Sequence, residues 1–358
     1  MPTVLLTGIT GFLAAHIALS FLQHNWTVHG TLRSSSKRSA VQAIPSYAPY
    51  LASGQLKLFI TGPLESADYD EAIKGAEAVV HTASPVEFGN EGFREKHLGP
   101  ALEGTKGVLE AAAREGSVKS VVYTSTFGAV GQHKSHPTEL KGRVITEHDW
   151  NPYTLEELDA IAAANKSDNP SHPPGVLFYM GSKKYAELAA WDAQEAARAR
   201  GAEWSLAAMN CVMIFGPPIQ PLTSLSNGGM STECLWTLAG GPGTRVMEAA
   251  FPYYVDVRDA AEAHYQAAVK HAQGRFILSA GPYDFQEIAD KLPHLYPAQA
   301  GRFAQGNTPG KYMYEDPGIY ELSNEKSREE LGIQYRGKDE TIRDAFDRFF
   351  ELEQQGLK

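Results

Sequence analysis

The chain has 358 residues, 43% of them hydrophobic, and its 32 Lys and Arg against 42 Asp and Glu leave a net charge of −10. This acidic balance argues against a nucleic-acid partner and against an anionic membrane surface. Cys211 and Cys234 are the only cysteines, which excludes a disulfide framework and a cysteine zinc site and fits a reducing, cytoplasmic compartment. The length predicts one large domain together with a smaller one.

No run of the sequence approaches the roughly 18 apolar residues that a membrane helix needs. The fairly apolar stretch Val4–Leu22 lacks the basic start of a signal peptide, and glycines and threonines interrupt it. His133 and His136 lie close together in a polar segment, but the twelve histidines are otherwise scattered. We therefore expect neither a membrane span nor a bound metal.

The first residues predict a dinucleotide-binding turn. A short apolar run, Val4 to Leu6, indicates a buried strand, and the pattern from Phe12 to about Gln23 indicates a helix. The spacing G-x-x-G-x-x-A at this junction allows a tight turn and lets a pyrophosphate approach the backbone at the positive end of the helix. The alternative is a purely structural turn. The cofactor contacts expected here are Thr7, Gly8, Thr10, Gly11, Phe12 and Leu13.

The second strand, expected at 26–31, indicates which dinucleotide binds. An NAD site usually carries an acid near this position to hold the ribose 2′-hydroxyl. The sequence instead has Arg33, Lys37 and Arg38, with three serines among them. A solvated helix start would explain the basic residues without a ligand. Basic side chains suit a 2′-phosphate, so the segment predicts NADP(H).

Strands and helices continue to alternate, which is typical of an α/β fold with a Rossmann-type, doubly wound parallel sheet. The small residues Thr82, Ala83 and Ser84 follow the fourth strand and suit a flat cofactor ring or ribose lying across them. The expected strands are 56–60, 78–81 and 120–124, and the expected helices are 67–74 and 93–115.

The second half of the chain has a different texture. Residues 131–175 read as a loop with a short helix at 155–164, and after Pro218 the segments become shorter and richer in glycine and proline. We expect residues 1–210 to form the NADP-binding domain that carries the catalytic residues. Residues 211–358 should form mainly a smaller α/β substrate-binding cap, with some segments returning to the first domain. The elements expected after the loop are helices 178–200, 258–271 and 339–353 and strands 204–209, 253–257 and 275–279.

Tyr179 and Lys183 form a Y-x-x-x-K pair on a predicted helix, so phenol and ammonium share one face. Reducing a carbonyl by hydride requires a proton at the developing alkoxide. A nearby ammonium, with a positive nicotinamide, lowers the phenol pKa and lets the tyrosine supply that proton. A hydroxyl from Thr126 or Ser125, after the fifth strand, would orient the carbonyl. Otherwise Tyr179 is a packed aromatic and Lys183 a solvated charge.

The whole sequence resembles the extended short-chain dehydrogenase/reductase superfamily. Within it, the chain is most similar to the fungal NADPH-dependent carbonyl, methylglyoxal and aldehyde reductases, which are related to dihydroflavonol and cinnamoyl-CoA reductases. The resemblance implies that Tyr179 is the proton donor, that Lys183 lowers its pKa and that Arg33 and Lys37 hold the 2′-phosphate. It rests on TGITGFLAAHI, TLRSSSK, HTASPV, GTKGVLEAA, VVYTST, YMGSKKYAE, MNCVMIFGPP and YYVDVRDAAEAH, in family order.

Four positions depart from the family pattern. The catalytic serine is usually the second residue of T-S-S, where this chain has Thr126 after Ser125. An acid near the adenine is replaced by Pro63, an asparagine of the long helix by Glu103, and a proline near the nicotinamide by Cys211. We therefore expect adenine contacts from neighbours such as Leu64, and a cofactor contact from Val212 at the nicotinamide end.

The substrate pocket should lie between the strand ends and the C-terminal cap. Its expected lining residues are Phe88, Phe127, Trp236, Ala249 and Phe251, each of which could instead belong to the core. An apolar wall of this kind suits hydrophobic or aryl ketones and aldehydes.

The sequence therefore predicts an NADPH-dependent reductase of small carbonyl compounds that acts as a monomer or homodimer. A sugar-nucleotide epimerase or dehydratase of the same superfamily is an alternative, although the basic residues after the second strand argue against it. A non-catalytic protein that senses NADP(H) is another, although the intact pair of Tyr179 and Lys183 argues against that.

Overall fold

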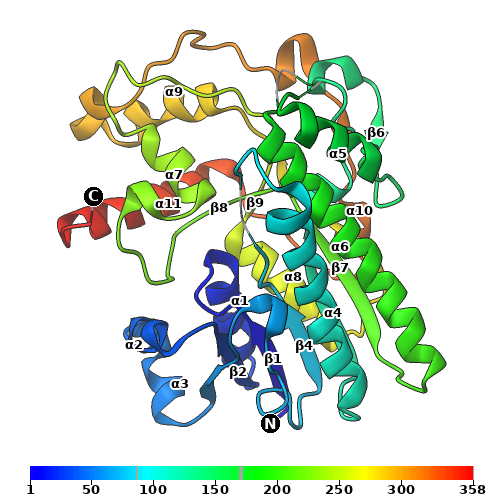
Figure 1. Ribbon diagram of the computed structural model, residues 1–358. Helices are drawn as coiled ribbons and strands as arrows, with labels where there is room; N and C mark the ends of the chain where they lie inside the picture. The colour runs from blue at the N-terminus through cyan, green and yellow to red at the C-terminus, as the bar shows by residue number, and fades with distance from the viewer. Residues whose placement is uncertain (86–87, 168, 170–171, 358) are drawn as a thin grey trace.

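The computed structural model describes residues 1–85, 88–167, 169 and 172–357. Among them, the main sheet has seven parallel strands in the order β10-β7-β5-β4-β1-β2-β3 (Figure 1). The predicted Rossmann-type, doubly wound α/β fold is therefore confirmed. These strands are β1 Thr3–Thr7, β2 Thr27–Leu32, β3 Leu56–Ile60, β4 Ala78–His81, β5 Ser120–Thr126, β7 Ser205–Cys211 and β10 Gly274–Leu278.

The strands are buried almost throughout because helices cover both faces of the sheet. Successive side chains point to opposite faces. In β1, Val4 and Leu6 belong to a core with α1 (Phe12–Gln23) and α8 (Val257–Val269), whereas Leu5 belongs to the core of the opposite face. That second face is covered by α4 (Gly99–Arg114) and α6 (Pro174–Ala199), which lie side by side in Figure 1.

The strand order reverses between β1 and β4. From β1 the chain proceeds outward to β2 and β3, then returns to add β4 on the other side of β1. At such a switch point the connections leave in opposite directions, and a crevice opens beyond the carboxyl ends of the strands. The fold therefore places a ligand site above β1 and β4.

The C-terminal part adds a second, smaller sheet with the order β11-β9-β8. Its strands are β8 Met213–Phe215, β9 Tyr253–Asp256 and β11 Gly281–Pro282. Phe215, Tyr254 and Phe346 belong to a core of their own beneath helices α7 Met230–Thr237, α9 Phe285–Leu295 and α11 Lys338–Gln354. In Figure 1 this part lies above the carboxyl edge of the main sheet.

Segments of the second half also pack against the main sheet. Strand β10 pairs with β7, and helix α8 lies against α1, where Phe21 meets the ring of Tyr265 at 5.2 Å. A further small strand, β12 (Glu321–Leu322), pairs with β6 (Val144–Ile145). Helix α10 (Glu325–Glu329) contacts β10. The division of the chain at residue 210 remains a prediction.

The expected helix at 67–74 is wrong. A short 3₁₀ turn at Leu64–Ser66 is followed by irregular turns, in which the Asp68 carboxylate accepts a hydrogen bond from the Asp70 amide at 2.9 Å. Such a local side-chain bond competes with helix formation. The long helix expected at 93–115 begins as a π-helical segment, Phe93–Leu98, before α4.

Several short helical segments complete the described chain. The loop region 131–175 contains α5 (Leu155–Ala164), at the predicted bounds. Two short helices, α2 (Arg38–Gln42) and α3 (Ala48–Ala52), follow β2. Within the described ranges, no helix combines the length and the apolar character that a membrane crossing requires.

Candidate active site

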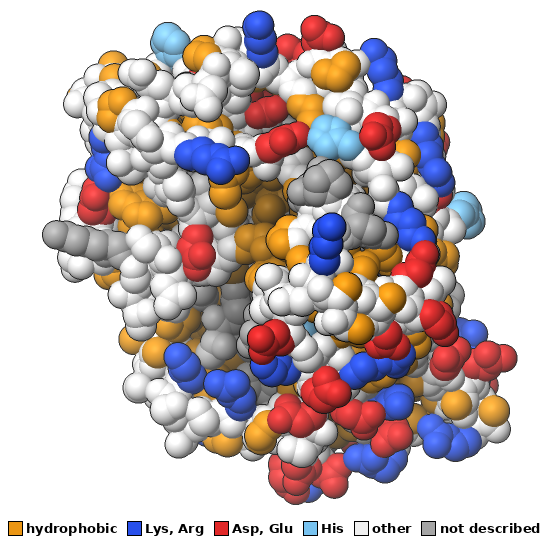
Figure 2. Space-filling model, turned by 45° about the horizontal axis from the view of Figure 1, so that its top comes forward, with side chains coloured by type: hydrophobic (Ala, Val, Ile, Leu, Met, Phe, Trp, Pro, Cys, Tyr) orange, Lys and Arg blue, Asp and Glu red, His pale blue; other side chains and the backbone are white. Residues whose placement is uncertain are grey.

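A cavity of about 1100 Å³ occupies the predicted crevice. Its floor comes from the carboxyl ends of β1, β4, β5 and β7, and its far wall from the C-terminal part, including Met213, Met230 and Phe251. Figure 2 shows hydrophobic side chains gathered in the hollowed middle of this face. The cavity is large enough for a dinucleotide together with a small substrate.

The glycine turn after β1 lines this cavity. Gly8 has a φ of +71°, and the Gly11 amide donates to the Gly8 carbonyl at 2.9 Å. A Cβ on Gly8 would lie 3.2 Å from Ala83, and one on Gly11 would lie 3.3 Å from the Gly8 carbonyl oxygen. Gly11 caps α1 without a side-chain hydrogen bond, so the first turn of the helix keeps amides for an anion. This cradle fits a pyrophosphate. Gly8, Thr10, Gly11, Phe12 and Leu13 all line the cavity.

Thr7 does not line the cavity. It is fully buried, and its hydroxyl accepts hydrogen bonds from the amides of Thr82 and Ala83, each at 3.1 Å. The Thr82 hydroxyl in turn donates to the Thr7 carbonyl at 2.5 Å. Thr7 therefore joins the ends of β1 and β4, and we do not propose it as a direct cofactor contact. Thr82, Ala83 and Ser84 do line the cavity.

The basic residues after β2 lie at different distances from the cavity. Arg33 lines it, whereas Lys37 does not and is exposed. Arg38 donates a hydrogen bond to the carbonyl of Leu58 on β3 at 3.1 Å, so it stabilises the fold next to the sheet. Leu64 lines the cavity and packs so closely on α4 that a Cβ on Gly104 would lie 2.5 Å from it.

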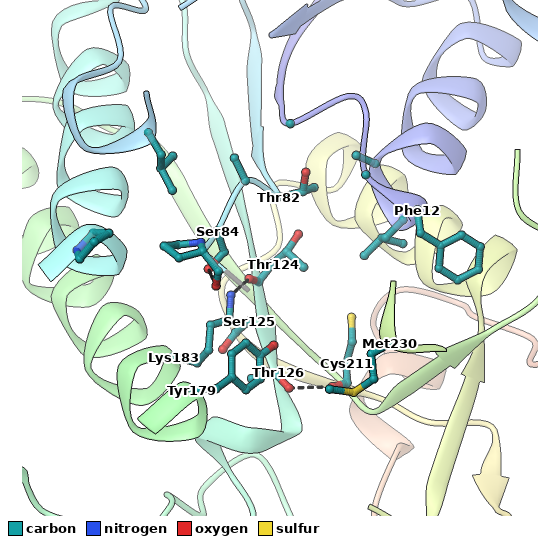
Figure 3. A pocket seen from close by; sticks show the side chains of 18 of the residues that line it. Phe12, Thr82, Ser84, Thr124, Ser125, Thr126, Tyr179, Lys183, Cys211 and Met230 are labelled. Carbon is teal, nitrogen blue, oxygen red and sulfur yellow. Dashed lines mark hydrogen bonds between the residues drawn. The ribbon is translucent and has the colours of Figure 1, made fainter. Parts of the chain in front are cut away.

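The tyrosine and the lysine of the Y-x-x-x-K pair face the end of β5 (Figure 3). The Tyr179 phenol lies beside the Thr126 side chain (Figure 3), which opposes the effect of burial on the phenol pKa. The Lys183 ammonium donates to the Thr124 carbonyl at 3.3 Å and lies 5.8 Å from the centre of the Tyr123 ring. Tyr179, Lys183 and Thr126 all line the cavity. Neither side chain of the pair is therefore merely a solvated surface group.

The two hydroxyls at the end of β5 have different partners. Thr126 also accepts a hydrogen bond from the Gly128 amide at 3.2 Å. Ser125 is 3% exposed and donates to the carboxylate of Glu187 at 2.5 Å. The sequence left the choice between these hydroxyls open, and only the Thr126 hydroxyl contacts Tyr179.

Known proteins share this sequence and this fold. Residues 5–166 match the 3-beta hydroxysteroid dehydrogenase/isomerase family. The NADPH-dependent methylglyoxal reductase of Saccharomyces cerevisiae is 30% identical over 361 residues, which cover 98% of this chain and 99% of the relative. A ketoreductase of Aspergillus niger is 31% identical over 357 residues and 96% of each chain.

The chain belongs to the extended short-chain dehydrogenase/reductase family. The crystal structure of yeast methylglyoxal/isovaleraldehyde reductase complexed with NADPH matches the fold with a TM-score of 0.82 at 28% identity, and the match covers 99% of each chain. The resemblance stated from the motifs and the predicted oxidoreductase class are therefore confirmed.

Burial shifts the pKa values of both Tyr179 and Lys183. It raises the pKa of the Tyr179 phenol to about 12, which outweighs the opposing effect of the Thr126 side chain. Burial also lowers the pKa of Lys183 to about 8, opposed by the charge interactions with Cys211 and Glu187. The expected lowering of the Tyr179 pKa is not found in the protein alone. At neutral pH Tyr179 therefore keeps its proton, and Lys183 remains mostly charged.

Three of the five residues expected in the substrate pocket line the cavity: Phe88, Phe127 and Phe251. The Phe88 ring lies 5.1 Å from that of Tyr179. Trp236 and Ala249 do not line the cavity. Trp236 packs 5.9 Å from Phe349 and lies beneath Arg302, while Ala249 is completely buried in the core of the C-terminal part. Both side chains stabilise the cap and do not reach the cavity.

The sequence analysis missed several lining residues. Met213 and Ile214 belong to the quoted motif MNCVMIFGPP and could have been proposed as a group with Val212, which also lines the cavity. Nothing in the sequence marks Met230, because it comes from a helix far along the chain. Val176, Met180 and Ser231 are among the other lining residues that were not predicted.

His133 and His136 both have structural partners. His133 is buried 5.7 Å from the ring of Phe127, and His136 bonds Glu248 at 2.8 Å. Among the described residues, no group of three metal-ligating side chains is found.

The glycine turn leads to a prediction for stability. Gly8→Ala places a side chain in the left-handed region, which costs about 1–2 kcal/mol, and presses it against Ala83. Gly54→Ala is a matched control, because Gly54 has a φ of +77° but open space around it. We expect Gly8→Ala to lower the free energy of unfolding by about 1–3 kcal/mol more than the control does. Equal losses in urea unfolding would show that the contact with Ala83 is unimportant.

Proposed function

We propose that this chain is an NADPH-dependent reductase of aldehydes and ketones. The observation that carries the proposal is the Tyr179 phenol beside Thr126, in the cavity that the glycine turn after β1 also lines. The names of two relatives support it, one an NADPH-dependent methylglyoxal reductase and the other a ketoreductase. The free thiols of Cys211 and Cys234 suit the reducing cytoplasm, where we place the enzyme.

NADPH would bind along the carboxyl edge of the main sheet. The turn at Gly8 and Gly11 would hold its pyrophosphate, and Leu64 would contact the adenine. Arg33, with the hydroxyls of the neighbouring serines, would hold the 2′-phosphate. When bound, NADPH supplies the hydride that adds to the carbonyl carbon.

Tyr179 would provide the proton. Its pKa is raised by burial, so the phenol reaches the reaction protonated. The Thr126 hydroxyl next to it would hold the carbonyl oxygen in place and stabilise the developing negative charge. The Lys183 ammonium donates a hydrogen bond to the Thr124 carbonyl of β5. Its positive charge would favour transfer of the proton from Tyr179 to the substrate oxygen. Ser125 takes no part in our scheme because Glu187 occupies its hydroxyl.

The cap would select the substrate. Its residues Met213, Met230 and Phe251 line the cavity together with Phe88, whose ring lies beside that of Tyr179, and they make this part of the wall apolar. Such a wall favours hydrophobic or aryl carbonyl compounds. In this proposal residues 1–210 bind the cofactor and carry the catalytic groups, and residues 211–358 mainly cover the substrate.

Tyr179→Phe tests the proton donor. The wild-type protein should oxidise NADPH with several members of a panel of methylglyoxal, an aryl ketone, a β-keto ester and a dihydroflavonol. Loss of the phenol should reduce kcat by about 10²- to 10⁴-fold and leave the Kd of NADPH nearly unchanged. The readouts are the loss of NADPH absorbance and a fluorescence titration.

Tyr185→Phe is the matched control for this variant. It removes a phenol from the same helix, at a side chain that stacks on Lys184 and does not line the cavity. We expect wild-type turnover. Normal turnover in Tyr179→Phe would remove Tyr179 from the mechanism.

Arg33→Ala tests the choice of cofactor. It should raise KM for NADPH by roughly 10- to 100-fold, since a hydrogen bond to a charged group is worth about 1.5–3 kcal/mol. KM for NADH should hardly change, because NADH has no 2′-phosphate. Lys57→Ala is the control, as Lys57 is exposed on the neighbouring β3 and does not line the cavity. Equal increases for both cofactors would contradict the phosphate assignment.

A further inference from the structure

A buried carboxylate lies behind the proposed site. Glu187 is 0% exposed on α6, one turn after Lys183 and two turns after Tyr179, so the three side chains share one face of the helix. The reduction as proposed above does not use this group. Burying a carboxylate costs several kcal/mol unless it is paired and hydrogen-bonded. Its partners therefore indicate what it does.

Both oxygens of Glu187 are occupied. Oε1 accepts a hydrogen bond from Nε of Arg275 at 2.6 Å. Oε2 accepts from the Ser125 hydroxyl at 2.5 Å and from the Asn210 side-chain amide at 2.8 Å. These partners belong to β10, β5 and β7, which are neighbours in the main sheet. One carboxylate thus joins the proposed catalytic helix to three strands.

Arg275 extends the network to the segment that follows β5. It is 8% exposed, and its guanidinium donates to the carbonyls of Glu147 at 2.8 Å and Asp149 at 2.5 Å. It also donates to the carbonyl of Ala129 at 3.4 Å and lies 3.7 Å from the centre of the Trp150 ring. The ion pair therefore fixes the chain on both sides of the end of β5.

The network reaches the proposed reacting groups through two of these partners. Ser125 is the residue before Thr126, and the Asn210 amide also donates to the Thr126 carbonyl at 3.4 Å. The Thr126 hydroxyl donates to the carbonyl of Cys211, the residue after Asn210, at 3.4 Å. A shift of either partner would move the Thr126 hydroxyl relative to Tyr179.

We propose that Glu187 is a positioning residue: paired with Arg275, it holds the helix of Tyr179 and Lys183 against the strand end that carries Thr126. This inference rests on the proposed function, since it concerns the geometry of that same site. Glu187 touches neither of the proposed reacting hydroxyls in the part of the chain that the structure describes, so it acts through Ser125 and the strand ends.

The charge of Glu187 gives the proposal a distinctive readout. A carboxylate one turn away favours the ammonium form of Lys183. Lys183 is also faced by Tyr179 on its own helix, by Tyr123 on β5 and by Cys211 on β7. It interacts with His81 on β4 as well, where burial keeps the imidazole neutral. Without the Glu187 charge, the Lys183 ammonium should lose its proton at a lower pH.

Glu187→Gln is the first variant. We expect kcat to fall about tenfold or more, because a small misplacement of reacting groups can cost up to about a hundredfold. The Kd of NADPH should stay the same, and the decline of the rate at high pH should begin at a lower pH. Asp259→Asn is the control, since Asp259 is 2% exposed, pairs with Arg336 and does not line the cavity. It should lose stability but keep kcat and the pH profile.

Two results would overturn the proposal. One is a Glu187→Gln enzyme with wild-type kcat. The other is a lower kcat with an unshifted pH profile, as expected when a purely structural ion pair is lost. If the single variant does not fold, Glu187→Gln combined with Arg275→Met removes both charges and leaves neither of them unpaired. The kcat and the pH profile of this double variant then test the proposal in the same way.

A second readout needs no turnover. The Cε chemical shift of ¹³C-labelled lysine reports the titration of Lys183 in the NADPH-bound protein. It should move to lower pH in Glu187→Gln, and an unchanged titration would overturn the role of the carboxylate. An inactive wild-type protein would contradict the proposed function, while this titration would still decide about Glu187.

Discussion

Parallel strands end at the same edge of a sheet, and this constraint places every proposed functional group in the molecule. β1 ends at the glycine turn, β4 at Thr82 and Ala83, β5 at Thr126, and β7 at Cys211. These segments are far apart in sequence, yet they line one cavity. The helix that carries Tyr179 and Lys183 crosses this edge. It thereby brings the proposed acid, Tyr179, next to Thr126, which would stabilise the oxyanion (Figure 3).

The polar side chains at this edge of the sheet are largely shielded from solvent. Lys183 is buried and Tyr179 is partly buried, and this burial holds the proton on the phenol but makes the ammonium easier to deprotonate. In a low-dielectric site, hydrogen bonds and charges act more strongly than in water. The ion pair of Glu187 and Arg275 lies one layer deeper and ties the strands to the helix. We regard the proposed acid and its supporting network as one unit, built from α6 and the sheet.

Much of the fold could be predicted from the sequence because its signals are local. Short apolar runs gave the strands, and the spacing of Gly8 and Gly11 marked the turn that the structure forms. The pair of Tyr179 and Lys183 was recognisable because the two residues are four positions apart on one helix. The prediction of a helix at 67–74 was wrong because the Asp68 side chain favours a turn. The apolar pattern of this segment could not reveal that local hydrogen bond.

The site was harder to predict where it depends on long-range packing. Ser125 and Thr126 are adjacent hydroxyls in the sequence, and only the fold shows that Glu187 binds one and Tyr179 the other. Trp236 resembles a pocket residue by its position in the cap, but it fills a core with Phe349. Met230 reaches the cavity from a helix whose sequence carries no marker.

The most direct measurement follows the hydride itself. NADPH deuterated at C4 of the nicotinamide, prepared as each of the two stereoisomers, is supplied with an aryl ketone, and the alcohol is analysed by mass spectrometry and NMR. We predict deuterium on the carbinol carbon from one of the two stereoisomers, with the hydroxyl proton coming from solvent by way of Tyr179. An alcohol without deuterium from either stereoisomer, or no alcohol with any carbonyl despite tight NADPH binding, would contradict the proposed reduction.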